Sequence, residues 1–186
     1  MRKVIAYVNA TIDGAMAGPN GELDWMRPDP ELNMTLSGEL RERVDTMLIG
    51  RGLYHGFGQN FRREATDPAS PAELVNFAIW MLETPKVVFS RSETSIAGSD
   101  VQQVSADIPG TVAALKQGSG KDMVVFGGVA PVQALVRAGL VDEFWLKVYP
   151  TALGTGQPIF GERTSLELID SRTGASGTLA LRYRAA

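Results

Sequence analysis

The sequence predicts an α/β fold in which helices flank a central mixed sheet and the chain ends in an antiparallel hairpin. Short runs of β-branched and aromatic residues alternate with helical segments. Several runs, such as Val87–Phe89 and Met123–Phe126, are continuously apolar, as expected of strands buried on both faces of a largely parallel sheet. The last two runs flank Gly174–Gly177, a glycine-containing turn typical of a hairpin.

Eight segments have the composition of strands. In chain order they are Lys3–Asn9, Thr46–Gly50, Lys86–Ser90, Val101–Val104, Asp122–Phe126, Glu143–Tyr149, Ser165–Arg172 and Thr178–Arg184.

The first helix is predicted to begin after Asp29, a good N-cap, with Pro30 at its first position. Its apolar residues recur at four-residue spacing, at Leu32, Leu36, Leu40 and Val44.

Ser70–Glu73 has the pattern of a capping box for a second helix, which ends before Pro85. Shorter helices are expected over Thr111–Gln117 and from Ala130–Pro131 to Gly139. Gly56–Pro71 is the longest stretch expected to be irregular.

The length of 186 residues predicts a single domain, 1–186. The composition excludes several kinds of chemistry. Without cysteine there are no disulfides, thiolate nucleophiles or cysteine-ligated zinc sites, and a lone histidine, His55, rules out paired-histidine zinc motifs. We therefore expect no metal site. The net charge of −3 argues against a general nucleic-acid surface. The apolar run Val4–Val8 is too short to span a membrane and has no signal-peptide pattern, so we expect a cytoplasmic protein.

The sharpest local feature is the junction at which Met123–Phe126 runs through Gly127 and Gly128 directly into a helix. Glycines let a ligand approach the backbone, and the free N–H groups of a helix start favour an anion. The alternative interpretation is a tight turn without a ligand. Neither the Gly-x-Gly-x-x-Gly fingerprint nor a P-loop occurs in the chain.

Two further strand ends carry similar residues: Gly50 with Arg51, and Ser90 with Arg91. Arginine suits bidentate phosphate binding, although a surface arginine is more often simply solvated. Together the three junctions predict one phosphate-rich ligand along the carboxyl edge of the sheet.

These motifs make the chain similar to the dihydrofolate-reductase-like superfamily, especially to the C-terminal reductase domain of the bifunctional riboflavin-biosynthesis deaminase-reductase. The resemblance extends almost from end to end. It is carried by Ala10–Ala17, Leu48–Arg51, Val125–Gly128, Leu135–Glu143, Tyr149–Pro150 and Leu153–Gly156.

The resemblance implies an NADPH-dependent reductase with a dihydrofolate-reductase-like sheet. By position, the backbone of Asn9 and Ala10 would hold the nicotinamide carboxamide. The adenosine side with its 2′-phosphate would be bound by Gly50, Arg51, Ser90 and Arg91. The pyrophosphate would be bound by Gly127, Gly128, Val129 and Ala130. In relatives the Gly-Gly bond is cis. Leu53 departs from the family, in which many members have a threonine.

The implied reaction is hydride transfer to a C=N or C=O of a small heterocycle, most specifically 5-amino-6-(5-phosphoribosylamino)uracil. The deaminase of that pathway needs a His/Cys zinc motif that this chain lacks, so a stand-alone reductase is expected. Arg27, Arg62, Arg63 and Lys147 are candidates to neutralise the substrate phosphate. The resemblance also suggests a homodimer.

Alternation along Glu143–Tyr149 places Trp145, Lys147 and Tyr149 on one face, which by resemblance faces the substrate. A lysine in a central strand needs an anionic partner, either the substrate or an acid such as Asp13. On an edge strand it would merely be solvated. Tyr7, Trp25 and Tyr54 are candidate pocket walls or, alternatively, plain core.

True dihydrofolate reductases bind pterin through an acid on the first helix. When Trp25–Pro28 is matched without gaps to the tryptophan-to-proline segment of those enzymes, the position of the acid is occupied by Pro30. The two neighbouring residues, Asp29 and Glu31, are acidic. With Lys147, these two carboxylates are the candidate catalytic residues. Their alternative role is to favour the helix dipole, and water could then deliver the proton. The competing functions are a pterin reductase, a nucleotide-binding homologue without catalysis, and an interaction module without a cofactor.

Overall fold

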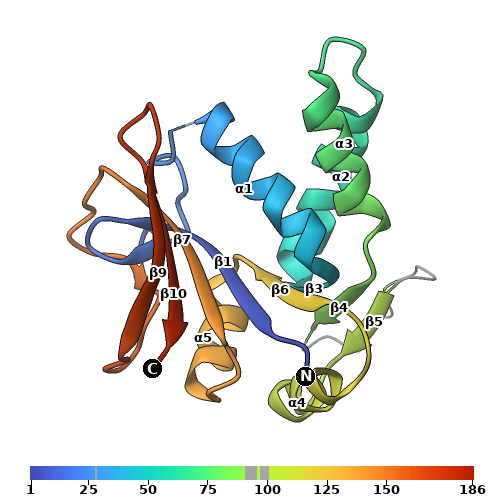
Figure 1. Cartoon of the computed structure of the whole chain (residues 1–186), viewed down its shortest axis with the longest axis vertical. Coiled ribbons are helices and arrows are strands. Elements are labelled where there is room, and N and C mark those ends of the chain that lie inside the picture. The colour runs from blue at the N-terminus through green and yellow to red at the C-terminus, as the bar shows by residue number, and fades with distance from the viewer. Residues whose placement is uncertain (28, 91–95, 97–100) are drawn as a thin grey trace.

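The computed structural model describes residues 1–27, 29–90, 96 and 101–186. An eight-stranded sheet crosses the molecule in the order β5-β4-β3-β6-β1-β7-β10-β9 (Figure 1). Its strands are β1 (Val4–Thr11), β3 (Val44–Gly50), β4 (Lys86–Phe89), β5 (Val101–Val104), β6 (Asp122–Phe126), β7 (Glu143–Tyr149), β9 (Leu166–Thr173) and β10 (Leu179–Ala185). All eight predicted strand segments are therefore confirmed, with small shifts at their ends.

The sheet is mixed, as predicted. Neighbours from β5 to β7 are parallel, whereas β10 runs antiparallel to both β7 and β9. The β9–β10 hairpin turns through the glycine-containing segment, where Gly174 N donates to Thr178 O at 2.8 Å. The predicted terminal hairpin is thus confirmed.

Helices cover both faces of the sheet (Figure 1). The helices α1 (Pro30–Arg43), α2 (Arg51–Thr66) and α3 (Ala72–Glu83) belong to the side that buries Ile5, Val124 and Trp145. On the other face α4 (Ile108–Gln117) and α5 (Val129–Arg137) pack against the alternate residues of the same strands, including Val4 and Val125. Alternation of side chains across each strand produces these two cores. None of the helices in the described ranges combines the length and apolarity needed to cross a membrane.

The expectation of an irregular stretch at Gly56–Pro71 is wrong, because α2 occupies most of it. Phe57 and Phe61, one helical turn apart, pack edge to face with their ring centroids 5.4 Å apart. The ring centroid of Phe61 lies 5.7 Å from that of Phe77 in α3. Tertiary packing of this aromatic face outweighs the low helix propensity of the glycines in α2.

Two smaller differences concern the ends of elements, and a third is a small sheet that was not predicted. Pro71, rather than Ser70, precedes α3, and the Ser70 hydroxyl bonds the Glu64 carboxylate instead of capping the helix. Val44 begins β3 instead of ending α1. A two-stranded sheet of β2 (Ala15–Ala17) and β8 (Gln157–Pro158) was not predicted. Strands of three and two residues are too short to show a hydrophobic periodicity.

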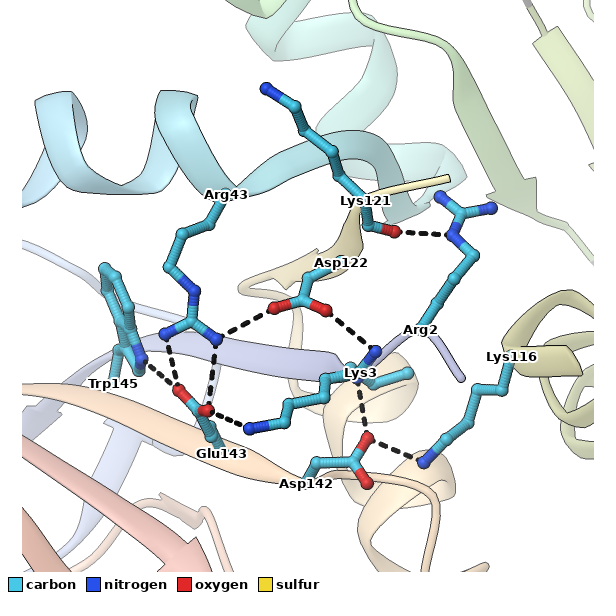
Figure 2. A network of polar contacts seen from close by, with 10 residues as sticks. Arg2, Lys3, Arg43, Lys116, Lys121, Asp122, Asp142, Glu143 and Trp145 are labelled. Carbon is cyan, nitrogen blue, oxygen red and sulfur yellow. Dashed lines mark hydrogen bonds and ion pairs between the residues drawn. The ribbon is translucent and has the colours of Figure 1, made fainter. Parts of the chain in front are cut away.

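An ion network closes the amino end of the central strands (Figure 2). Glu143, at the start of β7, accepts from Arg43 at 2.9 Å, from Lys3 at 3.0 Å and from the Trp145 indole at 3.2 Å. Arg43 also reaches Asp122, at the start of β6, at 2.8 Å. Burial disfavours the charged form of Glu143, but these hydrogen bonds outweigh it and lower its pKa to about 2.

The network continues beside β1. Asp142 accepts from the Val4 N–H at 2.7 Å and pairs with the buried Lys116 at 2.6 Å (Figure 2). Charged groups at this end are therefore matched by partners on neighbouring elements, which is the condition for burying them.

Candidate active site

The opposite, carboxyl end of the sheet is open at its centre. β1 pairs with β6 only from Val4 to Tyr7, yet continues beside β7 as far as Thr11. Lys3 O and Tyr7 O accept from Met123 and Gly127, so odd-numbered residues of β1 direct their backbone toward β6. Asn9 consequently presents its N–H and C=O beyond the end of β6, where the predicted carboxamide would bind. Ala10, in the alternate position, faces β7.

Gly127 and Gly128 form the corner between β6 and α5. Their φ angles are +42° and +73°, a region that strongly favours glycine. The cis bond expected from the family is absent here, because within the described residues every peptide bond is trans and the two positive φ angles make the turn. Gly128 is the N-cap, so the first amide groups of α5, at Val129 and Ala130, lie at this corner.

A second helix start meets the first. Gly50 is the N-cap of α2, and a Cβ built on Gly50 would lie 3.1 Å from Pro131 in the first turn of α5. Arg51 opens α2 and donates to the Ser90 hydroxyl at 3.3 Å. Leu53 lies over the glycine corner, 3.3 Å from the position of a Cβ on Gly128. Two helix N-termini, a guanidinium and a hydroxyl fit a diphosphate and a further phosphate. Arg91 lies outside the described residues.

Lys147 is buried on β7 beneath α1, with 8% of its surface exposed. Its ammonium donates to Asn33 Oδ1 at 2.8 Å and lies 5.3 Å from the centroid of the Tyr7 ring. Burial lowers the pKa of Lys147 to about 8, against the opposing effect of the Asp29 charge. The nearby anion is therefore Asp29 rather than Asp13, whose carboxylate accepts from Thr11, Leu153 and Gly154.

The two candidate carboxylates of the first helix differ. Asp29 is buried and is the N-cap, as predicted: one oxygen accepts from Leu32 N at 3.2 Å, and the other from the backbone and hydroxyl of Ser176 at 3.0 and 2.8 Å. The Ser176 bonds are the main cause of its lowered pKa. Glu31 is exposed in the first turn of α1. Both oxygens of Asp29 thus act in fixing α1 to the β9–β10 turn.

Three of the four aromatic candidates, Tyr7, Trp25 and Tyr149, lie around the central strands β1 and β7. Tyr149 packs edge to face with Trp25 at 5.5 Å, and burial raises its pKa. Burial and the neighbouring Tyr149 also raise the pKa of Tyr7, which packs against α1. Tyr54 lies elsewhere: it joins the cluster of Ile49 and Val88 and lines a separate cavity of about 350 Å³.

The arginines named for the substrate phosphate are dispersed. Arg62 lines that same cavity between α2 and α3, and Arg63 is exposed near the end of α2. Arg27 is exposed in the loop before α1. Lys147 instead borders a small cavity under α1 with Tyr7 and Arg182.

Sequence reasoning missed two residues of the site, Asn33 and Ser176. Asn33 follows Asp29 by four residues and so lies one helical turn along the same face of α1. That spacing was available in the sequence. Ser176 is brought to Asp29 only by the fold, across 147 positions. Gly174 permits this approach, since a Cβ there would lie 2.2 Å from the Asp29 carboxylate.

Comparison with known proteins places this geometry in a family. The chain is 33% identical over 187 residues to the uncharacterized protein YyaP of Bacillus subtilis, covering 98% of this chain and 94% of YyaP. A diaminohydroxyphosphoribosylaminopyrimidine deaminase/5-amino-6-(5-phosphoribosylamino)uracil reductase from Thermotoga maritima has the same fold, with a TM-score of 0.68 at 13% identity over all of this chain and 57% of that one.

Dihydrofolate reductase from Enterococcus faecalis, solved with NADP(H), also shares the fold, with a TM-score of 0.62 at 14% identity, covering 98% of this chain and 96% of that one. The model of the RibD C-terminal domain matches residues 2–180. The protein therefore belongs to the RibD C-terminal domain family and has a dihydrofolate-reductase-like fold.

Proposed function

We propose that the protein is an NADPH-dependent reductase that transfers hydride to a C=N or C=O of a small heterocycle, of the 5-amino-6-(5-phosphoribosylamino)uracil type. The observation that carries the proposal is the meeting of two glycine-capped helix starts, at Gly50 and Gly128, beside the part of β1 that extends past β6. Family membership and a neighbour solved with NADP(H) support it.

In this proposal the backbone of Asn9 and Ala10 orients the carboxamide of the cofactor. The amide groups from Gly127 to Ala130 bind the pyrophosphate, and Gly50, Arg51, Ser90 and Arg91 surround the adenosine with its 2′-phosphate. NADPH supplies the hydride when bound. Trp25, Tyr149 and Tyr7 form an apolar wall on the α1 face that excludes water from the reacting ring.

Lys147 holds a proton at Nζ on that same face and is the candidate to interact with the substrate. Asp29 and Asn33 act as positioning residues, because Asp29 fixes the start of α1 and Asn33 accepts from the ammonium. The engagement of both Asp29 oxygens leaves a pterin-binding role without support, so the uracil-type substrate is preferred.

Two measurements test the function. Titration of NADPH against tryptophan fluorescence is expected to saturate, and a flat titration would exclude both nucleotide-binding hypotheses. NADPH oxidation is then followed with dihydrofolate and with 5-amino-6-(5-phosphoribosylamino)uracil, and turnover of the latter is expected. Saturable binding with no turnover of either compound would contradict the proposed reaction and favour a homologue without catalysis.

The pH dependence identifies the contribution of Lys147. Because its pKa is about 8, the ammonium is present below that pH and lost above it. If the charged form binds substrate, kcat/KM falls tenfold per pH unit well above pH 8. In Lys147→Met this decline is expected to disappear together with most of the activity, whereas an unchanged profile would remove Lys147 from the mechanism.

A further inference from the structure

A buried acceptor at the proposed substrate face has no partner. Among the described residues, Asn9 Oδ1 and Arg182 Nε are the only buried side-chain nitrogen or oxygen atoms without a hydrogen-bond partner. An unsatisfied buried polar atom loses its bonds to water and gains none, which destabilises the fold. The Asn9 amide takes no part in the ion network, and a bound ligand with a donor would give its oxygen a partner.

The side chain of Asn9 lies on the α1 face of the sheet. It has the same parity along β1 as Ile5 and Tyr7, which pack on the α1 side, and it is in register with Lys147 on the neighbouring strand. Residues in register on adjacent parallel strands project side by side. The two residues therefore lie side by side, with an acceptor on Asn9 and a cationic donor on Lys147. The Lys147 ammonium has three hydrogens, and Asn33 Oδ1 accepts from it at 2.8 Å.

We propose that Asn9 is a specificity-determining residue that, together with Lys147, recognises the lactam edge of the heterocycle. Such an edge carries a ring N–H beside a C=O. The N–H donates to Asn9 Oδ1, and the carbonyl oxygen accepts from the Lys147 ammonium. This assignment rests on the proposed function and restricts its substrate to rings with a free N–H next to a carbonyl, while the phosphate is bound elsewhere.

The geometry favours the substrate over the cofactor as the ligand of this amide. The backbone of Asn9 points within the sheet toward the gap beyond β6, whereas its side chain projects from the sheet toward α1. The same residue thus contributes its backbone to the carboxamide and its side chain to the ring that receives the hydride. NADPH affinity should accordingly be insensitive to the side chain.

Calorimetry on the unaltered protein saturated with NADP⁺ tests the proposal without any substitution. The probes are 5,6-diaminouracil, which has free ring N–H groups, and its 1,3-dimethyl derivative, which has none. We expect the first to bind at least about fivefold more tightly, the effect of one neutral hydrogen bond lost with its partner left buried. Equal affinities, or no binding of either probe, would overturn the lactam assignment.

A substitution then assigns that preference to Asn9. Asn9→Leu removes the unsatisfied oxygen and keeps the branching and the number of side-chain heavy atoms. Its Tm is therefore expected to stay the same or rise by about 2 °C, while the preference for the unmethylated probe disappears. The matched control Asn76→Leu, at an exposed position of α3, should alter neither quantity. A fall in Tm with the preference intact would show that the amide has a structural role only.

NADPH binding, measured in the same preparations, keeps the two proposals separate. Absence of NADPH binding to the unaltered protein contradicts the proposed function itself. NADPH binding that is normal in the unaltered protein but weakened in Asn9→Leu contradicts only the inference, because the amide would then serve the cofactor.

Discussion

The two ends of the central strands differ in how their polar groups are satisfied. At the amino end, Glu143 has three donors, Arg43 bridges two carboxylates, and Asp142 binds both a backbone N–H and a buried lysine (Figure 2). At the carboxyl end, β1 extends past the end of β6, and glycines are the N-caps of two helices. The buried Asn9 Oδ1 has no hydrogen-bond partner there.

This contrast distinguishes charged groups that already have partners from polar groups that are available to a ligand in the proposed function. Charges at the amino end already have complementary partners, so a ligand would gain little there. Amide groups at a helix start exchange hydrogen bonds to water for bonds to a ligand, and the unsatisfied Asn9 acceptor gains a bond when a donor binds. Substitutions at the amino end should therefore alter stability alone, and those at the carboxyl end should alter binding.

The largest effect is expected from Glu143→Ala. It leaves Arg43 and the Trp145 indole without their shared acceptor, and we expect the free energy of unfolding in urea to fall by about 3–5 kcal/mol. NADPH affinity should be unchanged in the folded fraction. Glu167→Ala is the matched control, because Glu167 pairs with Arg184 in an exposed ion pair and should cost less than about 1 kcal/mol. A large loss of NADPH affinity in Glu143→Ala would break the separation of the two ends.

Acid should destabilise the protein through the same carboxylate. The pKa of Glu143 is lowered from 4.5 to about 2 in the folded state, so its contribution is complete above pH 4.5 and is lost as the pH falls toward 2. The shift corresponds to at most about 3 kcal/mol, because solvent screens the attraction to the exposed Lys3. Urea unfolding between pH 5 and pH 2 measures this loss. In Glu143→Gln the free energy of unfolding should fall less steeply with decreasing pH. Equal slopes would assign the acid sensitivity to other groups.

At the carboxyl end, Arg51→Ala should change cofactor preference with little effect on folding. Loss of a charge-assisted contact with the 2′-phosphate is expected to reduce the preference for NADPH over NADH by about 10-fold, and Arg51→Ala with Arg91→Ala should abolish it. Comparison of the two Kd values by fluorescence titration provides the measurement. Arg63→Ala, on the same helix but exposed, should retain the preference. An unchanged ratio in the double variant would refute the assignment of the 2′-phosphate site.

The smallest expected effects separate the two carboxylates of α1. Asp29→Ala removes the N-cap and its bonds to Ser176, and should lower the free energy of unfolding by about 1–2 kcal/mol. Glu31→Ala, on the exposed face, should change it by less than about 0.5 kcal/mol and leave turnover unaltered. Loss of turnover in Glu31→Ala at normal stability would support the alternative hypothesis that Glu31 is the pterin-binding acid.

Much of the fold was accessible from local patterns, since all eight strands of the large sheet, the Asp29 cap and the terminal hairpin were predicted. The α2 helix was not, because its glycines mask a helix that aromatic contacts with α3 stabilise. The roles assigned to individual site residues remain predictions.

The sequence by itself determined which segments form strands, where glycines interrupt them, and that Trp145, Lys147 and Tyr149 share a face, because these properties depend on residues close together in the chain. Tertiary structure alone decided that β1 would extend past β6, that Asn33 would meet Lys147, and that Asp29 would bond to Ser176. Those contacts join residues up to 147 positions apart, and no local pattern records which distant groups the packing of helices on a sheet will bring together.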